Sequence, residues 1–155
     1  MDDITLRIAK EEDMQAVWEM QTEAFSDLLK KYRDYDTSPA AESLEKVMER
    51  YRQPWTTYYF IEAKNETVGV VRVVDKRDGS MKRISPIWIM QEHRNKGYAQ
   101  AAIAALEQIH GSENWCLDTI LQEKGNLHLY KKMGYHQTGQ TEKINDSMDI
   151  VFYEK

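Results

Sequence analysis

The sequence has few of the features that mark secreted, membrane or metal-binding proteins. Cys116 is the only cysteine in 155 residues, so an internal disulfide is impossible and a reducing, cytoplasmic location is expected. No apolar run approaches the ~18 residues of a membrane span. The acidic start of the chain, residues 1–3, does not resemble a signal peptide. The four histidines are scattered, without ligand spacing, so we expect neither a membrane partner nor a metal.

Positive charge is also scarce. The chain has 21 Lys and Arg against 26 Asp and Glu, a net charge of −5, which argues against nucleic acid as the main partner. The imbalance is local, because residues 1–50 hold thirteen acidic side chains against seven basic ones. If this acidic third borders a binding pocket, it favours a cationic substrate. A solvated helical surface is the alternative interpretation.

The length predicts one domain over residues 1–155. Hydrophobic periodicity predicts the order β-α-α-β-β-β-α-β-α-β-β. One long first helix is expected from the acidic residues 11–13 to residues 30–31, and a second is expected to start with Ser38 as its N-cap and Pro39 at its first position. Strands are expected at residues 4–9, 56–63, 67–74, 82–91, 114–121, 135–140 and 148–153.

The stretch around Gly97 organises the chain. An apolar strand ends near Met90, a polar turn follows, and a helix with a regular apolar stripe begins after the glycine. The first turn of a helix offers unpaired N–H groups and a positive dipole end, which together suit a phosphate. Gly97 lacks the Cβ that would keep a diphosphate away from the backbone, and Arg94 and Lys96 add positive charge beside it. The turn therefore predicts an anion site.

Residues 94–99, with the sequence RNKGYA, resemble the [RQ]-x-x-G-x-[GA] signature of the GNAT superfamily of N-acetyltransferases, of the single-domain bacterial type. Residues 129–135, LYKKMGY, resemble that family's LY-x-x-x-G-[FY] helix end, and the two motifs have the family's order and separation. The resemblance implies a mixed α+β fold with a mostly antiparallel sheet of about seven strands, flanked by about four helices. It also implies that strands four and five splay apart, and Pro86 in the fourth is compatible with a bulge there.

The resemblance further implies an acetyl-coenzyme A cosubstrate. The strand end and the turn are expected to hold it. These cofactor residues are Ile89, Met90, Gln91, Arg94, Asn95, Lys96, Gly97, Tyr98, Ala99 and Gln100. Where the family often has a pantetheine-binding Asn, this chain has Glu123, so that contact is in doubt, although Asn126 can still reach the cofactor.

Two residues are expected to carry the chemistry. Tyr130 matches the family's tyrosine that points at the thioester sulfur, and a phenol that keeps its proton at neutral pH can act as general acid. Asp118 lies twelve residues earlier, where many members place an acid, and is the candidate base, directly or through a water. Tyr130 could instead only pack its ring on the sheet, Asp118 could be structural, and Glu92 or a water chain could be the base.

The predicted enzyme is an N-acetyltransferase that moves an acetyl group from acetyl-coenzyme A to a small-molecule primary amine by direct transfer in a ternary complex. The alternatives are a protein or peptide N-acetyltransferase and a non-catalytic acyl-coenzyme A sensor. Tyr32, Asp34 and Tyr35, with Asp36, lie in a loop expected to border the acceptor. Either a monomer or a homodimer is compatible with the sequence.

Overall fold

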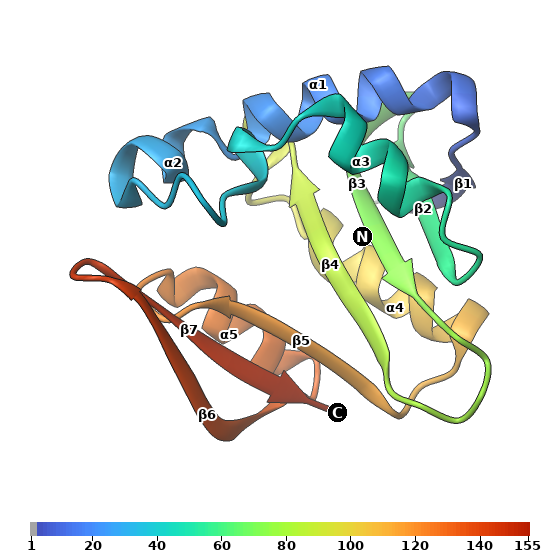
Figure 1. Cartoon of the computed structure of the whole chain (residues 1–155). Helices are drawn as coiled ribbons and strands as arrows, with labels where there is room; N and C mark the ends of the chain where they lie inside the picture. Colours follow the sequence, from blue (N-terminus) through green and yellow to red (C-terminus); the bar gives the residue numbers. More distant parts are fainter. Residues whose placement is uncertain (1–2) are drawn as a thin grey trace.

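The computed structural model describes residues 3–155 and shows one seven-stranded sheet with helices on both faces (Figure 1). The strand order is β1-β2-β3-β4-β5-β7-β6. Among the described strands only β4 and β5 run parallel. Met1 and Asp2, part of the acidic start, lie outside the described residues. The strands are β1 (Thr5–Ile8), β2 (Thr56–Ala63), β3 (Glu66–Val74), β4 (Lys82–Ile89), β5 (Trp115–Ile120), β6 (His136–Asn145) and β7 (Met148–Glu154).

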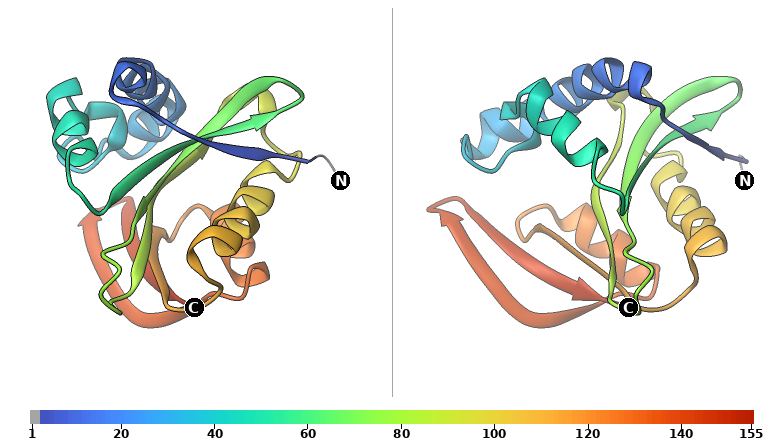
Figure 2. Two further views of the ribbon diagram at one scale, coloured as in Figure 1. Left: turned by 90° about the vertical axis from the view of Figure 1, so that its right-hand side faces the viewer. Right: turned by 45° about the vertical axis from the view of Figure 1, so that its right-hand side comes forward.

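The helices form two layers. Figure 2 shows α1, α2 and α3 on one face of the sheet, and α4 and α5 on the other. This arrangement, with a mostly antiparallel sheet, confirms the predicted mixed α+β class. The helices are α1 (Met14–Ala24), α2 (Ser26–Tyr32), α3 (Leu44–Tyr51), α4 (Tyr98–His110) and α5 (Lys124–Lys132), with short 3-10 turns η1 (Glu11–Asp13), η2 (Pro39–Ala41) and η3 (Gln91–His93).

Alternation along the central strands builds a hydrophobic core under each helix layer. In β2, Tyr58 and Phe60 are buried in the core that also contains Met14 of α1 and Val47 of α3. Their neighbours Tyr59 and Ile61 belong to the core that includes Ile103 and Leu106 of α4. Because successive side chains of a strand point to opposite faces, one aromatic-rich strand serves both cores.

A bulge in β4 lies at Pro86. Val71 of β3 pairs with Ile87, but Val73 pairs with Ile84, so the register shifts between these pairs. Two residues of β4, Ser85 and Pro86, therefore lie opposite a single residue of β3. Proline has no backbone N–H for a regular ladder, which explains why the extra residue is accommodated here.

The first two predicted helices differ from the structure. The long first helix divides at Phe25, whose φ of −101° and ψ of 3° leave the α-helical region, so α1 and α2 are separate. Ser38 caps only η2, through the N–H of Ala40. Glu42 is extended, with ψ of 144°, and α3 starts later, with Ser43 as its N-cap. The prediction that the second helix starts with Ser38 as its N-cap was therefore wrong, because Ser38 caps a separate 3-10 turn and Ser43 caps α3.

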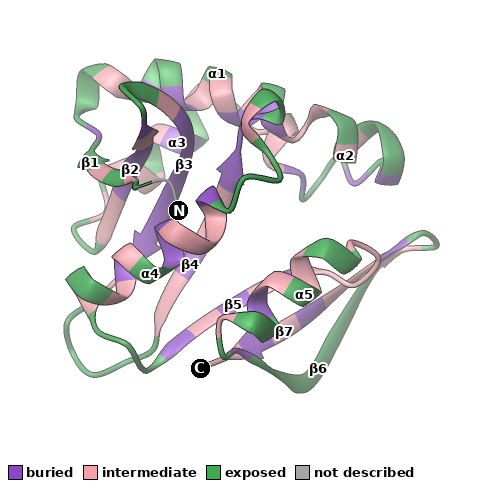
Figure 3. Ribbon diagram, turned by 180° about the vertical axis from the view of Figure 1, so that it is seen from behind, coloured by how far each residue is buried: buried purple, intermediate pink, exposed green. Residues whose placement is uncertain are grey.

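The last strand pair is longer than predicted. β6 extends to Asn145 rather than ending near Gln140. It pairs with β7 alone and lies at the edge of the sheet. Most of its residues are exposed (Figure 3), and because it carries so little apolar sequence its length could not be read from hydrophobic alternation.

Candidate active site

The candidate site lies where β4 and β5 separate. Pairing between them ends at Arg83 opposite Cys116, whereas β3 follows β4 as far as Ile89. Beyond Arg83 the two strands diverge (Figure 1), and β4 has no strand partner on this side within residues 3–155. Backbone N–H and C=O groups need partners, so an extended ligand with amide groups can pair with the open edge.

The turn that follows β4 carries two residues in the left-handed region, Asn95 with φ of 64° and Gly97 with φ of 81°. Gly97 is the N-cap of α4. A Cβ placed on Gly97 would meet no atom within 4 Å, so the space over this turn is open. The first turn of α4 has N–H groups without intrahelical partners and a positive dipole end. The turn therefore has the geometry of an anion site.

The other predicted turn residues have different surroundings. Lys96 is exposed, as are Gln91 and Asn95. Ala99 and Gln100 are half-buried on α4. Tyr98 is buried in the core under α4, so its backbone alone can face a ligand.

Arg94 fixes the turn. Its Nε donates to the carbonyl oxygen of Ile89 at 2.8 Å, and its Nη2 donates to that of Ala24 at 3.1 Å. The guanidinium thus ties the turn to the end of β4 and to α1. The N–H of Met90 donates to the carbonyl oxygen of Val68 at 2.8 Å. The Ile89 carbonyl retains one lone pair for a pantetheine amide.

A cleft of about 630 Å³ opens beside the split. Its walls come from α2 and α3 with the segment between them, from the strands β3, β4, β5, β6 and β7, and from α5. Both Asp118 and Tyr130 line it. The cleft therefore leads from the outer surface to the place where β4 and β5 part.

Asp118 lies on the cleft side of β5, opposite the buried Leu117. Its Oδ2 accepts a hydrogen bond from Nη2 of Arg83 at 2.6 Å, across the point where the two strands begin to diverge. Oδ1 makes no hydrogen bond with residues 3–155. One oxygen is thus held in place, and the other is available to accept a proton or a water.

Tyr130 of α5 has 6% of its surface exposed, and its ring packs against Tyr135 and Tyr153. Its hydroxyl makes no hydrogen bond within the described chain. Burial, and then the charge of Asp118, raise the pKa of Tyr130 above its ordinary value. The phenol therefore keeps its proton at neutral pH and can donate it.

Asn126 and Glu123 of the α5 region have separate roles. Nδ2 of Asn126 donates to Oγ1 of Thr119 at 3.3 Å, and both residues line the cleft. Glu123 instead accepts from Nζ of Lys31 at 2.9 Å and from the hydroxyl of Tyr32. The acid at the family's asparagine position therefore joins α5 to the end of α2. Glu92, the alternative base, has 70% of its side chain exposed and does not line the cleft.

Of the four candidate acceptor residues Tyr32, Asp34, Tyr35 and Asp36, only Asp34 is in the cleft wall. Asp34 lines the cleft, is buried, and has an Oδ1 without a hydrogen-bond partner among residues 3–155. Burial raises the pKa of Asp34. Tyr32 is buried and bonded to Glu123, whereas Tyr35 is 64% exposed, and neither lines the cleft. Asp36 is exposed and also lies outside it.

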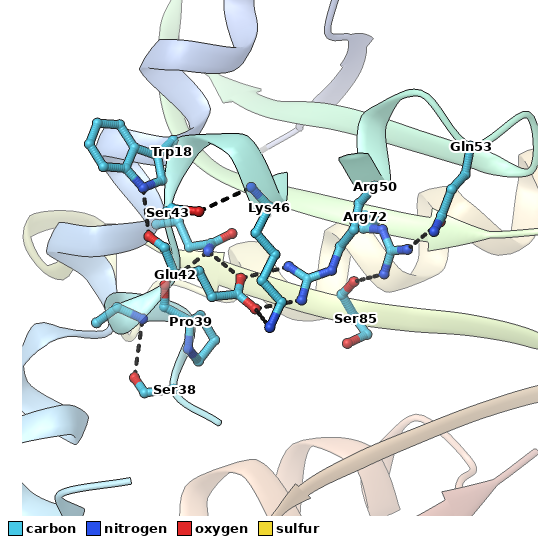
Figure 4. Close-up of polar contacts among 12 residues, drawn as sticks. Trp18, Ser38, Pro39, Glu42, Ser43, Lys46, Arg50, Gln53, Arg72 and Ser85 are labelled. Atoms are coloured by element: carbon cyan, nitrogen blue, oxygen red, sulfur yellow. Dashed lines mark hydrogen bonds and ion pairs between the residues drawn. The ribbon is translucent and has the colours of Figure 1, made fainter. Parts of the chain in front are cut away.

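Several cleft residues had no place in the sequence prediction. Glu42, Arg50 and Arg72 lie close together on the sheet face covered by α3 (Figure 4). Of the acidic residues described in positions 3–50, only Asp34 and Glu42 line the cleft, so most of the acidic side chains of this third lie outside its wall. An arginine within the valine-rich β3 was the one signal in the sequence that pointed to this surface.

No group of three or more His, Cys, Asp or Glu side chains within residues 3–155 is arranged to hold a metal ion. Within the same residues, no helix is both long and apolar enough to span a bilayer.

Solved structures with the same fold include two amine-modifying enzymes. The spermidine N-acetyltransferase from Vibrio cholerae, in complex with CoA and spermine, superposes with a TM-score of 0.76 at 18% identity, over 97% of this chain and 94% of that one. The ribosomal-protein-S18-alanine N-acetyltransferase from Escherichia coli has a TM-score of 0.74 at 9% identity, over 97% of this chain and 91% of that one. At such identities the similarity shows the fold alone.

Sequence comparison gives the family. N-acetyltransferase 8F1 of Rattus norvegicus is 22% identical in an alignment of 116 positions that covers 70% of this chain and 52% of the rat protein, so the match spans about half the length of that relative. The family model of the acetyltransferase (GNAT) family matches residues 14–135, from α1 to the segment just after α5. The chain therefore belongs to the acetyltransferase (GNAT) family.

Proposed function

We propose that the protein transfers an acetyl group from acetyl-coenzyme A to a primary amine of a small molecule, directly and within a ternary complex. One observation carries the proposal. A proton donor, Tyr130, and a carboxylate, Asp118, line one cleft beside the split between β4 and β5. The glycine turn at the start of α4 follows the open strand of that split. A general base and a general acid both assist acyl transfer to an amine, and the turn would hold the acyl donor beside them.

The split and the turn would hold the cosubstrate. The open edge of β4 would pair with the pantetheine amides, and the backbone at Gly97 would bind the diphosphate. The solved spermidine N-acetyltransferase with this fold contains CoA, which supports the same cosubstrate here. Bound in this way, acetyl-coenzyme A supplies a thioester as the acyl donor.

Asp118 would remove the proton from the amine. An ammonium group with a pKa near ~10.4 is mostly protonated at neutral pH and must become neutral before it can attack. The Arg83 guanidinium fixes Oδ2 of Asp118 and directs the free Oδ1 toward the cleft or a water within it. Because an aspartate side chain is short, a water relay is compatible with this position.

Tyr130 would give a proton to the departing thiolate. Its raised pKa keeps the hydroxyl protonated, and its ring is fixed by two aromatic neighbours. Since no residue in the described chain accepts its hydrogen bond, the hydroxyl is available for the sulfur. A positioned acid of this type contributes roughly 10²–10⁴-fold to the rate.

Proteins of this fold act on different amines, such as spermidine or the alanine of a ribosomal protein, as their names state. The volume of the cleft, about 630 Å³, is that of a small-molecule site and favours a small amine over a protein terminus. A sensor that only binds acyl-coenzyme A would need neither Asp118 nor Tyr130.

Release of free thiol from acetyl-coenzyme A should be measured with small amines, and with peptides whose N-terminal residue presents the same amine. We expect higher kcat/KM for small amines. Faster turnover of the peptides would support a protein acceptor, and coenzyme binding without turnover of any acceptor would support the sensor.

A further inference from the structure

The wall of the cleft contains an arginine where the strand sequence would favour an apolar residue. Arg72 is in β3, between Val71 and Val73, and only 8% of its surface is exposed. It lies on the same face of the strand as Val70, which is buried under α1 and α3. Placing a guanidinium in such a layer costs free energy unless the charge finds a partner.

The partners of Arg72 are all neutral. Its Nη1 donates to the carbonyl oxygen of Ser85 at 2.9 Å, and its Nη2 donates to Oε1 of Gln53 at 3.2 Å (Figure 4). The same Nη2 donates to Oγ1 of Thr56 at 3.3 Å. No carboxylate of residues 3–155 forms an ion pair with it. Glu42, the acid next along this wall, is already paired with Arg50. Burial lowers the pKa of Arg72, and the nearby Arg50 adds to this effect.

The other charges of the cleft leave this one uncompensated. Arg50 pairs with Glu42, and Arg83 pairs with Asp118, so these four charges cancel. Two cations of the cleft wall have no ion pair within the described chain, Arg72 and Lys76. Lys76 lies over the ring of Trp55. Two acids also remain, Asp34 and Glu142, which belong to the loop after α2 and to β6. Of these four residues only Arg72 is a cation buried in the strand layer, and it has no ion-pair partner among residues 3–155.

We propose that the acceptor carries a carboxylate as well as its amine, and that this carboxylate binds Arg72 in the wall of the cleft. The acceptor class is thus a small amino carboxylic acid. Arg72 is the specificity-determining residue, because its guanidinium has no anionic partner among residues 3–155 and a charge-assisted hydrogen bond in a low-dielectric wall favours a carboxylate over a neutral group. This inference rests on the proposed acetyl transfer, and it replaces the purely cationic acceptor suggested by the acidic first third.

The test uses matched acceptors and matched variants. Thiol release should be measured for a panel of amino acids, each paired with its carboxamide, and for the same amines with a phosphonate in place of the carboxylate. We expect wild-type kcat/KM to favour the carboxylate over the amide by roughly 10- to 100-fold. Weak activity on the phosphonate identifies the planar carboxylate as the preferred anion, whereas a preference for the phosphonate would overturn the assigned acceptor class.

Arg72→Gln should remove the preference for the carboxylate, because kcat/KM should fall by a larger factor for the acids than for their amides. Arg72→Lys should retain part of it. Arg52→Gln is the matched control, because Arg52 carries the same charge with 65% of its side chain exposed and lies outside the cleft wall. Melting temperatures of all three variants show whether each is folded. If Arg72→Gln does not fold, the carboxylate preference of Arg72→Lys and of the wild type decides the question.

Two results would separate the inference from the function on which it rests. If amines are acetylated but acids and amides have equal kcat/KM in the wild type, Arg72 only joins β2 to β4 and the proposal about the acceptor is wrong. An equal loss for acids and amides in folded Arg72→Gln would overturn it in the same way. If no amine in the panel is acetylated, the proposed function itself fails.

Discussion

The change Tyr130→Phe isolates the proposed acid. It removes one oxygen that makes no hydrogen bond within the described chain. The ring contacts with Tyr135 and Tyr153, at centroid distances of 6.0 and 6.1 Å, remain possible for phenylalanine. We therefore expect the free energy of unfolding to change by less than about 1 kcal/mol.

Catalysis should respond far more strongly. If the hydroxyl protonates the thiolate, kcat should fall by roughly 10²–10⁴-fold, a barrier increase of about 3–5 kcal/mol. The affinity for coenzyme A should stay within a few-fold, because the hydroxyl acts on the leaving group in the transition state. Steady-state thiol release gives kcat, and calorimetry gives the affinity.

Tyr135→Phe is the matched control. Tyr135 is also buried, its hydroxyl also lacks a partner among residues 3–155, and its pKa is also raised, first by burial, but it does not line the cleft. Its loss should leave kcat nearly unchanged. A folded Tyr130→Phe variant with wild-type kcat would refute the assigned acid.

Three further changes test the turn, the base and the support of the sheet. Gly97→Trp should abolish the rise in melting temperature that coenzyme A causes in the wild type; an unchanged rise in a folded variant would remove the turn from the site. Asp118→Asn should lower kcat/KM at neutral pH, and the defect should shrink at high pH, where the amine loses its proton without help; wild-type activity at neutral pH would make the residue structural. His110→Ala should lower the free energy of unfolding by about 2–4 kcal/mol, measured in denaturant, because His110 bonds Tyr59 at 2.9 Å and Asp75 at 3.0 Å. Although burial opposes it, the bond to His110 lowers the pKa of Asp75. The stability that ionised Asp75 contributes through this bond should therefore be present at neutral pH and lost as the pH falls below roughly 4. A difference in unfolding free energy between wild type and His110→Ala that stays constant down to about pH 3 would contradict the assignment.

Much of the fold could be predicted because its signals are local. Alternating apolar residues marked the strands, and the glycine after β4 marked the start of α4 where the structure has it. Pro86 marked a bulge because its missing N–H has a local consequence. The division at Phe25 was not predictable, since the helical apolar pattern continues through it.

The candidate site was less accessible from the sequence because its contacts are long-range. Tyr32 was expected near the acceptor, but its hydroxyl bonds Glu123, 91 positions away. The pairing of Arg83 with Asp118 depends on where β4 and β5 stop pairing. Local patterns identify such residues without showing which of them face one cleft.

Transfer of an isotopically labelled acetyl group tests the central claim most directly. The protein should be incubated with labelled acetyl-coenzyme A, with and without an amino carboxylic acid, and all products measured by mass spectrometry. Direct transfer predicts one labelled N-acetyl amine for each coenzyme A released, and an unchanged protein mass when the acceptor is absent. Label on the protein itself, or coenzyme A release without any labelled amide across the amine panel, would contradict direct transfer to a small amine.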